Sequence, residues 1–153
     1  MRYSDIYIEQ KQLDNLFDTV EQLPADPEIR SNWAKYLCIR VSGFLETAIS
    51  VILTEYTRKR AHPRVANRVS AELRFFTNPN MQKVLDLIGS FDLTWAAELE
   101  RDCTGEIKEA IDSIYSIRNP IAHGESVGLT PASMAKYYKQ AKALVSLVDQ
   151  LCK

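Results

Sequence analysis

The chain has 153 residues, of which 46% are hydrophobic and 25% charged, and its formal net charge is −1. This composition is ordinary for a soluble globular protein, and the length suffices for one hydrophobic core, so we expect a single domain over residues 1–153. The first ten residues lack an apolar signal core, and no uninterrupted apolar run reaches the ~20 residues of a membrane span. The sequence thus predicts a protein that is neither secreted nor membrane-spanning.

The helical repeat of apolar residues covers most of the chain, and no segment shows the alternation of a strand. Prolines and capping residues separate the segments: Asp26 before Pro27 and Thr130 before Pro131 have the pattern of an N-cap and a first helical residue, and Thr104 is a further N-cap. We expect an all-α protein, most simply a bundle of four or five main helices. The expected helical segments are 4–22, 27–60, 63–76, 81–91, a short element around 95–99, 106–118 and 131–152.

The segment 27–60 is unusually long. At about 1.5 Å per residue it would reach about 50 Å, which is more than a domain of this size needs. We therefore expect this helix either to overhang the bundle at its end or to bend near Gly43.

Basic residues are concentrated in the segment 57–75, which holds six of them and one acid. Such a segment can attract a polyanion and steer it toward a site. The alternative is a solvated helical face, since no aromatic residue that could stack on a base is interleaved before Phe75. The residues expected to contact RNA phosphates are Arg58, Lys59, Arg60, Arg64 and Arg68. His62, beside them, is expected to be a plain loop residue.

The most informative segment is residues 118–123, Arg-Asn-Pro-Ile-Ala-His. Isoleucines at 107, 111 and 114 form one helical stripe, and the next position on this inward stripe is Arg118. A permanent cation there is costly unless it is paired or lines a wet cavity. Arginine can hold a phosphate with two hydrogen bonds and histidine can move a proton near neutral pH, so Arg118 and His123 indicate phosphodiester chemistry. The alternative is an arginine that is paired within the bundle for structural reasons.

Pro120 is expected to end the helix, because proline lacks a backbone donor and disfavours helical backbone before it. Asn119 would then be the N-cap of whatever follows. On one straight helix, side chains five residues apart point about 140° away from each other. A break at Pro120 would instead allow Arg118 and His123 to line the same cavity.

These residues resemble the motif of the HEPN domain family. Nuclease members of that family carry an arginine, four to six intervening residues and a histidine after a helix of a helical bundle, and a polar residue usually follows the arginine. Arg118, Asn119 and His123 match this pattern. The segments 42–46 and 80–88 look most like the RiboL-PSP type of HEPN protein.

The resemblance implies metal-independent RNA cleavage, with two copies of the motif meeting across a homodimer, and it implies no cofactor. In the chemistry that these side chains allow, a 2′-hydroxyl attacks the adjacent phosphorus, a neutral histidine takes its proton and an arginine stabilises the phosphate oxygens. The spacing of histidines and carboxylates suggests no metal site. One departure is Glu125, since the toxins of this family that are silenced by adenylylation carry tyrosine at that position.

Glu46 is the remaining candidate residue. It shares a helical stripe with the small residues Ser42, Gly43 and Ser50, which would permit close approach of another helix or chain. Its carboxylate either orients His123 or pairs with Arg118, or it is simply exposed.

Two functions remain open from the sequence. The first is an endoribonuclease that could serve as a toxin or defence effector with a cognate antitoxin protein. The second is a non-catalytic module that binds a partner protein or a nucleotide. The three cysteines (Cys38, Cys103 and Cys152) are odd in number and widely spaced, which is typical of free thiols in a cytoplasmic protein.

Overall fold

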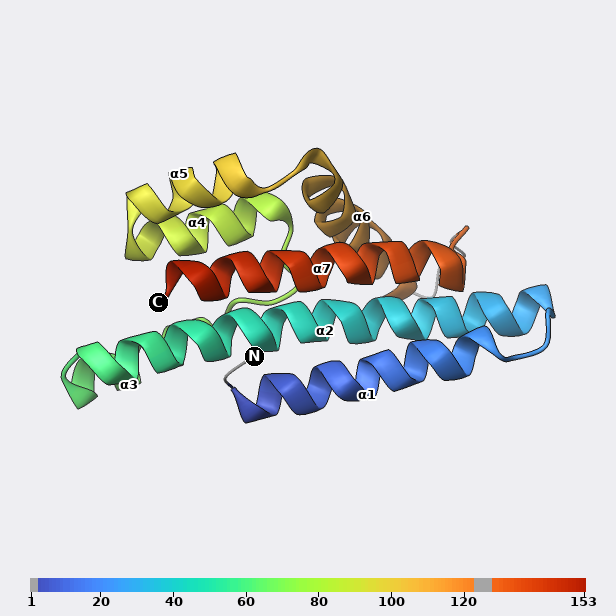
Figure 1. Cartoon of the computed structure of the whole chain (residues 1–153), viewed down its shortest axis with the longest axis horizontal. Helices are drawn as coiled ribbons and strands as arrows, with labels where there is room; N and C mark the ends of the chain where they lie inside the picture. Colours follow the sequence, from blue (N-terminus) through green and yellow to red (C-terminus); the bar gives the residue numbers. More distant parts are fainter. Residues whose placement is uncertain (1–2, 123–127) are drawn as a thin grey trace.

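The structure is a computed structural model that describes residues 3–122 and 128–153 (Figure 1). Within these residues all regular structure is helical, as the sequence predicts. Helices α3, α4 and α5 have only 10 or 11 residues each, which is why the number of helices exceeds the four or five main ones expected. The helices are α1 (Ser4–Glu21), α2 (Pro27–Arg60), α3 (Pro63–Leu73), α4 (Met81–Phe91), α5 (Leu93–Asp102), α6 (Gly105–Ala122) and α7 (Pro131–Leu151).

The predicted capping residues begin the helices. The Asp26 carboxylate accepts hydrogen bonds from the backbone N–H groups of the first turn of α2, and the Thr130 hydroxyl accepts one from Ser133 in α7. Thr104 accepts a hydrogen bond from the Ile107 N–H at the start of α6. Each cap satisfies a donor that the first turn of a helix leaves free. The sequence therefore located these three starts to within a residue.

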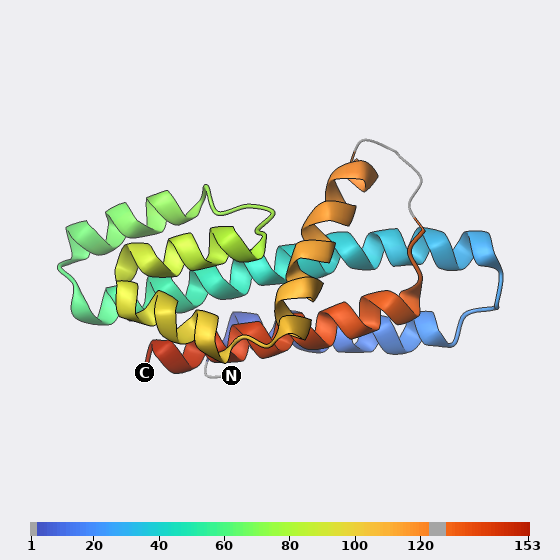
Figure 2. The same ribbon diagram turned by 90° about the horizontal axis from the view of Figure 1, so that it is seen from above.

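Helix α2 is the axis of the fold, and it packs against α1, α3, α6 and α7. It is unbroken at Gly43 and extends beyond both α1 and the end of α7, where α3 folds back along it (Figures 1 and 2). The expectation of an overhanging end is confirmed.

The same helix is the one helix in the described part of the chain that is long and apolar enough to cross a membrane. It contains no long uninterrupted apolar run, because polar residues alternate with the apolar ones along the helix. Of the apolar 18-residue stretch of α2, 56% is buried within the bundle. Packing against the neighbouring helices therefore accounts for this composition, as expected for the central helix of a soluble protein.

Helix α6 lies steeply across α2 and α7 (Figure 2). The predicted break at Pro120 was wrong, because α6 continues to Ala122 with Pro120 inside it. A proline lacks the N–H that would bond to the carbonyl oxygen four residues earlier, and here only two residues of helix follow it. Asn119 is therefore a residue of α6 and not an N-cap. Arg118 lies one turn before the end of the helix.

The buried side chains form one cluster to which every helix contributes. The isoleucine stripe of α6 is part of this cluster, as its spacing predicts: Ile107, Ile111 and Ile114 are at most 5% exposed. The next residue on the stripe, Arg118, is thereby directed toward α2.

Candidate active site

Arg118 meets Glu46 where α6 crosses α2. Closer to the centre of this crossing, the Cys38 thiol lies 3.9 Å from the carbonyl oxygen of Ile114. One turn further along α6, Nη2 of Arg118 lies 3.8 Å from Oε1 of Glu46, and the two side chains are 30% and 22% exposed. Of the readings of Glu46, the structure supports pairing with Arg118 and contradicts an exposed glutamate.

A loop residue completes this contact from a third side. Asn78 lies between α3 and α4, and its backbone N–H donates a hydrogen bond of 2.5 Å to Oε1 of Glu46. The Asn78 side-chain amide donates a second hydrogen bond, of 2.9 Å, to Oδ1 of Asn119. Glu46, Asn78, Arg118 and Asn119 therefore form one polar cluster built from α2, α6 and the loop.

The same loop is anchored to α6 at a second point. The Asp112 carboxylate of α6 accepts a hydrogen bond of 2.9 Å from the N–H of Met81, the first residue of α4. Asn80 caps α4 by accepting a hydrogen bond from Lys83. Asn78 thus lies just before a helix whose first residue is tied to α6.

The positive charge of Arg118 acts on the Cys38 thiol, which is buried beneath the polar cluster. Burial raises the pKa of the Cys38 thiol to about 11, while the positive charge of Arg118 acts in the opposite direction. Cys38 is fully buried, so it is a packed thiol and not a nucleophile at neutral pH.

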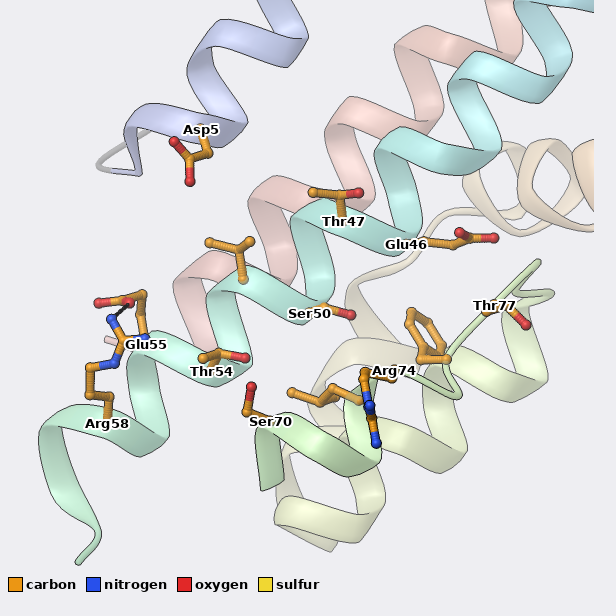
Figure 3. A pocket seen from close by; sticks show the side chains of 13 residues that line it. Asp5, Glu46, Thr47, Ser50, Thr54, Glu55, Arg58, Ser70, Arg74 and Thr77 are labelled. Atoms are coloured by element: carbon orange, nitrogen blue, oxygen red, sulfur yellow. Dashed lines mark hydrogen bonds and ion pairs between the residues drawn. The ribbon is translucent and has the colours of Figure 1, made fainter. Parts of the chain in front are cut away.

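A groove of about 490 Å³ extends from Glu46 along α2. Its floor is the outward stripe of α2, and α3 with the following loop forms the opposite wall (Figure 3). Its residues include five hydroxyl side chains, two arginines and a phenylalanine ring. They are Thr47, Ser50, Thr54, Ser70 and Thr77, then Arg58 and Arg74, and Phe76.

Three carboxylates, those of Asp5, Glu46 and Glu55, line this groove together with the two arginines. The Arg58 guanidinium lies 2.6 Å from the Glu55 carboxylate, and Glu46 is paired with Arg118. Arg74, from the end of α3, is exposed and donates a hydrogen bond to the carbonyl oxygen of Ala71. The groove therefore offers hydroxyl and guanidinium donors, which are the groups that contact sugar and phosphate oxygens.

The structure separates the five basic residues that the sequence grouped together. Arg58 lines the groove, whereas Arg60 and Arg68 lie on the other side of α3. Arg60 stacks on the Tyr56 ring at 4.2 Å, and Arg68 pairs with Glu72 at 3.0 Å. Lys59 and Arg64 are exposed and line neither hollow. These five residues are close in the sequence, but they do not form one surface.

The structure describes one of the two histidines, His62. His123 lies outside the described residues, directly after the end of α6. His62 is the N-cap of α3, and its Nδ1 accepts a hydrogen bond of 3.2 Å from the N–H of Arg64. His62 therefore has a structural task at the start of a helix.

Two site residues were not predicted from the sequence. Arg74 belongs to the basic segment but was not chosen, because nothing in the sequence shows which face of α3 turns toward Glu46. Asn78 gave no signal except an asparagine before a proline, which favours a turn. In the described part of the chain, His, Cys, Asp and Glu side chains form no group of three or more that could hold a metal ion.

Comparison with known proteins identifies one family. No curated protein and no solved structure matches the sequence significantly. The family model described as RiboL-PSP-HEPN matches residues 4–153, which is nearly the whole chain and includes α2, the loop with Asn78 and the motif of α6. The chain therefore belongs to the RiboL-PSP-HEPN family.

Proposed function

We propose that this protein is a metal-independent endoribonuclease of the HEPN type, with Arg118 and His123 as its catalytic pair. The observation that carries the proposal is the state of Arg118, which is partly exposed and held by Glu46 through a single oxygen at 3.8 Å. An arginine that served only to neutralise a carboxylate would form a shorter, two-pronged contact. Within the residues that the structure describes, Glu46 is the one ion-pair partner of Arg118, which leaves guanidinium donors for a phosphate.

The reaction uses the nucleophile that RNA carries. The 2′-hydroxyl attacks the adjacent phosphorus while His123 takes its proton, and the P–O bond to the 5′-oxygen of the next nucleotide breaks as that oxygen gains a proton. Arg118 stabilises the charge that develops on the phosphate oxygens. The products are a 2′,3′-cyclic phosphate and a 5′-hydroxyl. Glu46 orients Arg118 in this scheme, and Asn119 lies beside it at the site.

The groove along α2 gives the RNA a path to this site. It begins at Glu46 and is lined by hydroxyl groups, Arg58 and Arg74, with the Phe76 ring available to stack on a base. Within the basic segment, these two arginines are therefore the residues that we assign to RNA contacts on this path. Lys59, Arg60, Arg64 and Arg68 contribute at most to the general field.

A homodimer would complete the site, because a two-fold axis brings two copies of the motif together, so that an arginine of one chain and a histidine of the other can act on one phosphate. Such an enzyme in the cytoplasm needs control, so a toxin or defence effector with a cognate antitoxin protein fits this activity. Because Glu125 stands in place of the tyrosine that accepts adenylylation, the control of this protein would differ from that of toxins silenced in this way.

The deciding experiment is cleavage of total RNA by the purified protein in excess EDTA. We expect activity in the parent protein and in His62→Ala, and no activity in His123→Ala or Arg118→Ala. His62→Ala is the matched control, because it removes the other imidazole and affects only the cap of α3. The ends of the fragments should be 2′,3′-cyclic phosphates.

A specific observation also favours the second candidate, a non-catalytic binding module. Arg118 has an ion-pair partner in its own chain, as a structural arginine would. If the parent cleaves no RNA, or if His123→Ala cleaves as fast as the parent, this second function becomes the better description.

A further inference from the structure

Asn78 is held in a conformation that a loop residue rarely adopts. Its φ angle is 44°, in the left-handed region that disfavours side chains with a Cβ, although asparagine tolerates it better than most. Its side-chain oxygen Oδ1 is buried and has no hydrogen-bond partner among the described residues. Both features cost free energy, and residues that carry such costs cluster at functional sites.

Both features serve the polar cluster around the motif. The left-handed turn directs the backbone N–H of Asn78 to Oε1 of Glu46. The position that leaves Oδ1 buried brings the amide nitrogen of the same side chain to Asn119. One residue therefore holds Glu46 by its backbone and Asn119 by its side chain.

These contacts of Asn78 affect where the Arg118 guanidinium lies relative to Glu46. The Asn78 N–H lies much closer to Oε1 of Glu46 than Nη2 of Arg118 does, at 2.5 Å against 3.8 Å. The same carboxylate oxygen is thus shared by a donor of the loop and the guanidinium of α6, so the position of Asn78 helps to set where Glu46 meets Arg118. Asn119, next to Arg118 on α6, is held in turn by the amide.

We propose that Asn78 is a positioning residue for Arg118, acting through Glu46 and Asn119. The proposal rests on the proposed ribonuclease activity and names a residue outside the motif on which that activity depends. Asn78 touches neither the phosphate nor the 2′-hydroxyl. Its effect is on the geometry of the groups that do.

Replacing Asn78 by glycine separates its two contacts. Glycine adopts the left-handed turn without strain, so the N–H donor to Glu46 is kept while the amide that holds Asn119 is removed. We expect kcat to fall by about tenfold or more and KM to stay within about twofold, because misplacement by about 1 Å can cost as much as 100-fold in rate. Asn119→Ala should have the same effect, and the double variant should be no slower than either single variant, since both remove one contact.

Asn80→Gly is the matched control. It makes the same substitution two residues away in the same loop and removes the side-chain cap of α4, but not a contact with the motif. We expect its kcat to equal that of the parent. If Asn80→Gly slows the reaction as much as Asn78→Gly does, or if the effects of Asn78→Gly and Asn119→Ala multiply, the positioning role is wrong.

A second measurement is independent of RNA. In ¹⁵N–¹H spectra, the side-chain amide resonances of Asn119 should move in Asn78→Gly and stay in place in Asn80→Gly. Unmoved resonances in Asn78→Gly would overturn the inference whatever the activity. An inactive parent in which the resonances do move would contradict the proposed function alone.

Discussion

Arg118 stands where the helical repeat of α6 calls for an aliphatic side chain, and its surroundings explain how the fold tolerates it. The side chain lies at the rim of the α2–α6 contact, where it remains 30% exposed and meets Glu46. An ion pair that is partly solvated contributes only about 0–1 kcal/mol to stability. The pair is therefore weak as a structural element, which is consistent with a guanidinium kept available for a ligand.

The buried thiol beneath this pair predicts how stability depends on pH. The pKa of Cys38 is raised from 9.0 to about 11 by burial. The folded protein therefore keeps the thiol protonated at pH values at which the unfolded chain releases the proton. The stability that this provides is fully present below pH 9 and is lost as the pH rises toward 11.

We expect the free energy of unfolding of the parent to decrease relative to that of Cys38→Ala by about 2–3 kcal/mol across this range, which corresponds to a shift of about two pKa units. Urea denaturation of both proteins at pH 8, 9, 10 and 11 measures the difference. Cys38→Ala is the control because it cancels the contributions of other groups, such as Tyr138, whose pKa is also raised by burial. A constant difference between the two proteins would contradict the expectation.

At the scale of helices, what the sequence could predict was local. Apolar spacing and caps such as Asp26 and Thr130 act within one or two turns, so the starts of α2 and α7 were predicted to the residue, whereas the predicted ends of α3 and α6 were three and four residues away from the observed ones. Pro120 misled because the φ angle that proline fixes is compatible with helical backbone, and the loss of one hydrogen bond did not break α6 before Ala122. Arg118 and its motif could be selected because a charge interrupts a regular apolar stripe.

The contacts around the motif could not be predicted in the same way. Asn78 bonds to Glu46, 32 residues earlier, and to Asn119, 41 residues later. No periodicity links such positions, because their meeting depends on the angle at which α6 crosses α2 and on the turn between α3 and α4. The division of the basic segment between two sides of α3 was hidden for the same reason.

Because the basic segment is divided between different sides of α3, we predict different roles for Arg74 and Arg64. Arg74 lines the groove and Arg64 does not, although both are exposed. In an inactive His123→Ala background, we expect Arg74→Gln to weaken binding of single-stranded RNA and to reduce the slope of log affinity against log salt by about 0.7, the value for one lost phosphate contact. Arg64→Gln should leave both quantities nearly unchanged.

Fluorescence anisotropy with a labelled RNA at several salt concentrations measures affinity and slope together. Arg64→Gln is the matched control, since it removes the same charge from the same segment. Equal losses in the two variants would show that the segment acts as a diffuse positive field and that the groove is not the path of the RNA.

At the scale of the whole molecule, the proposed site needs a second copy of the chain. We expect a symmetric homodimer with twice the 17.4 kDa mass of the chain in light scattering at micromolar concentration. Because Arg118 and His123 of both chains would line one groove, mixing inactive Arg118→Ala with inactive His123→Ala should restore part of the activity. Each mixed dimer then has one intact arginine and one intact histidine.

Mixing two preparations of His123→Ala is the control and should restore nothing. A monomer, or a dimer whose inactive variants do not complement each other, would contradict a site shared between two chains.

The order of the helices along the chain has a consequence for synthesis. Helix α7 packs against both α2 and α6, the helices that carry Glu46 and Arg118, and it follows both in the sequence. During translation these two helices leave the ribosome before the helix that holds them together. A nascent chain that already contains Arg118 therefore lacks the helix that packs on both α2 and α6. A nuclease built in this order would complete the support of its Glu46–Arg118 pair only after α7 had emerged.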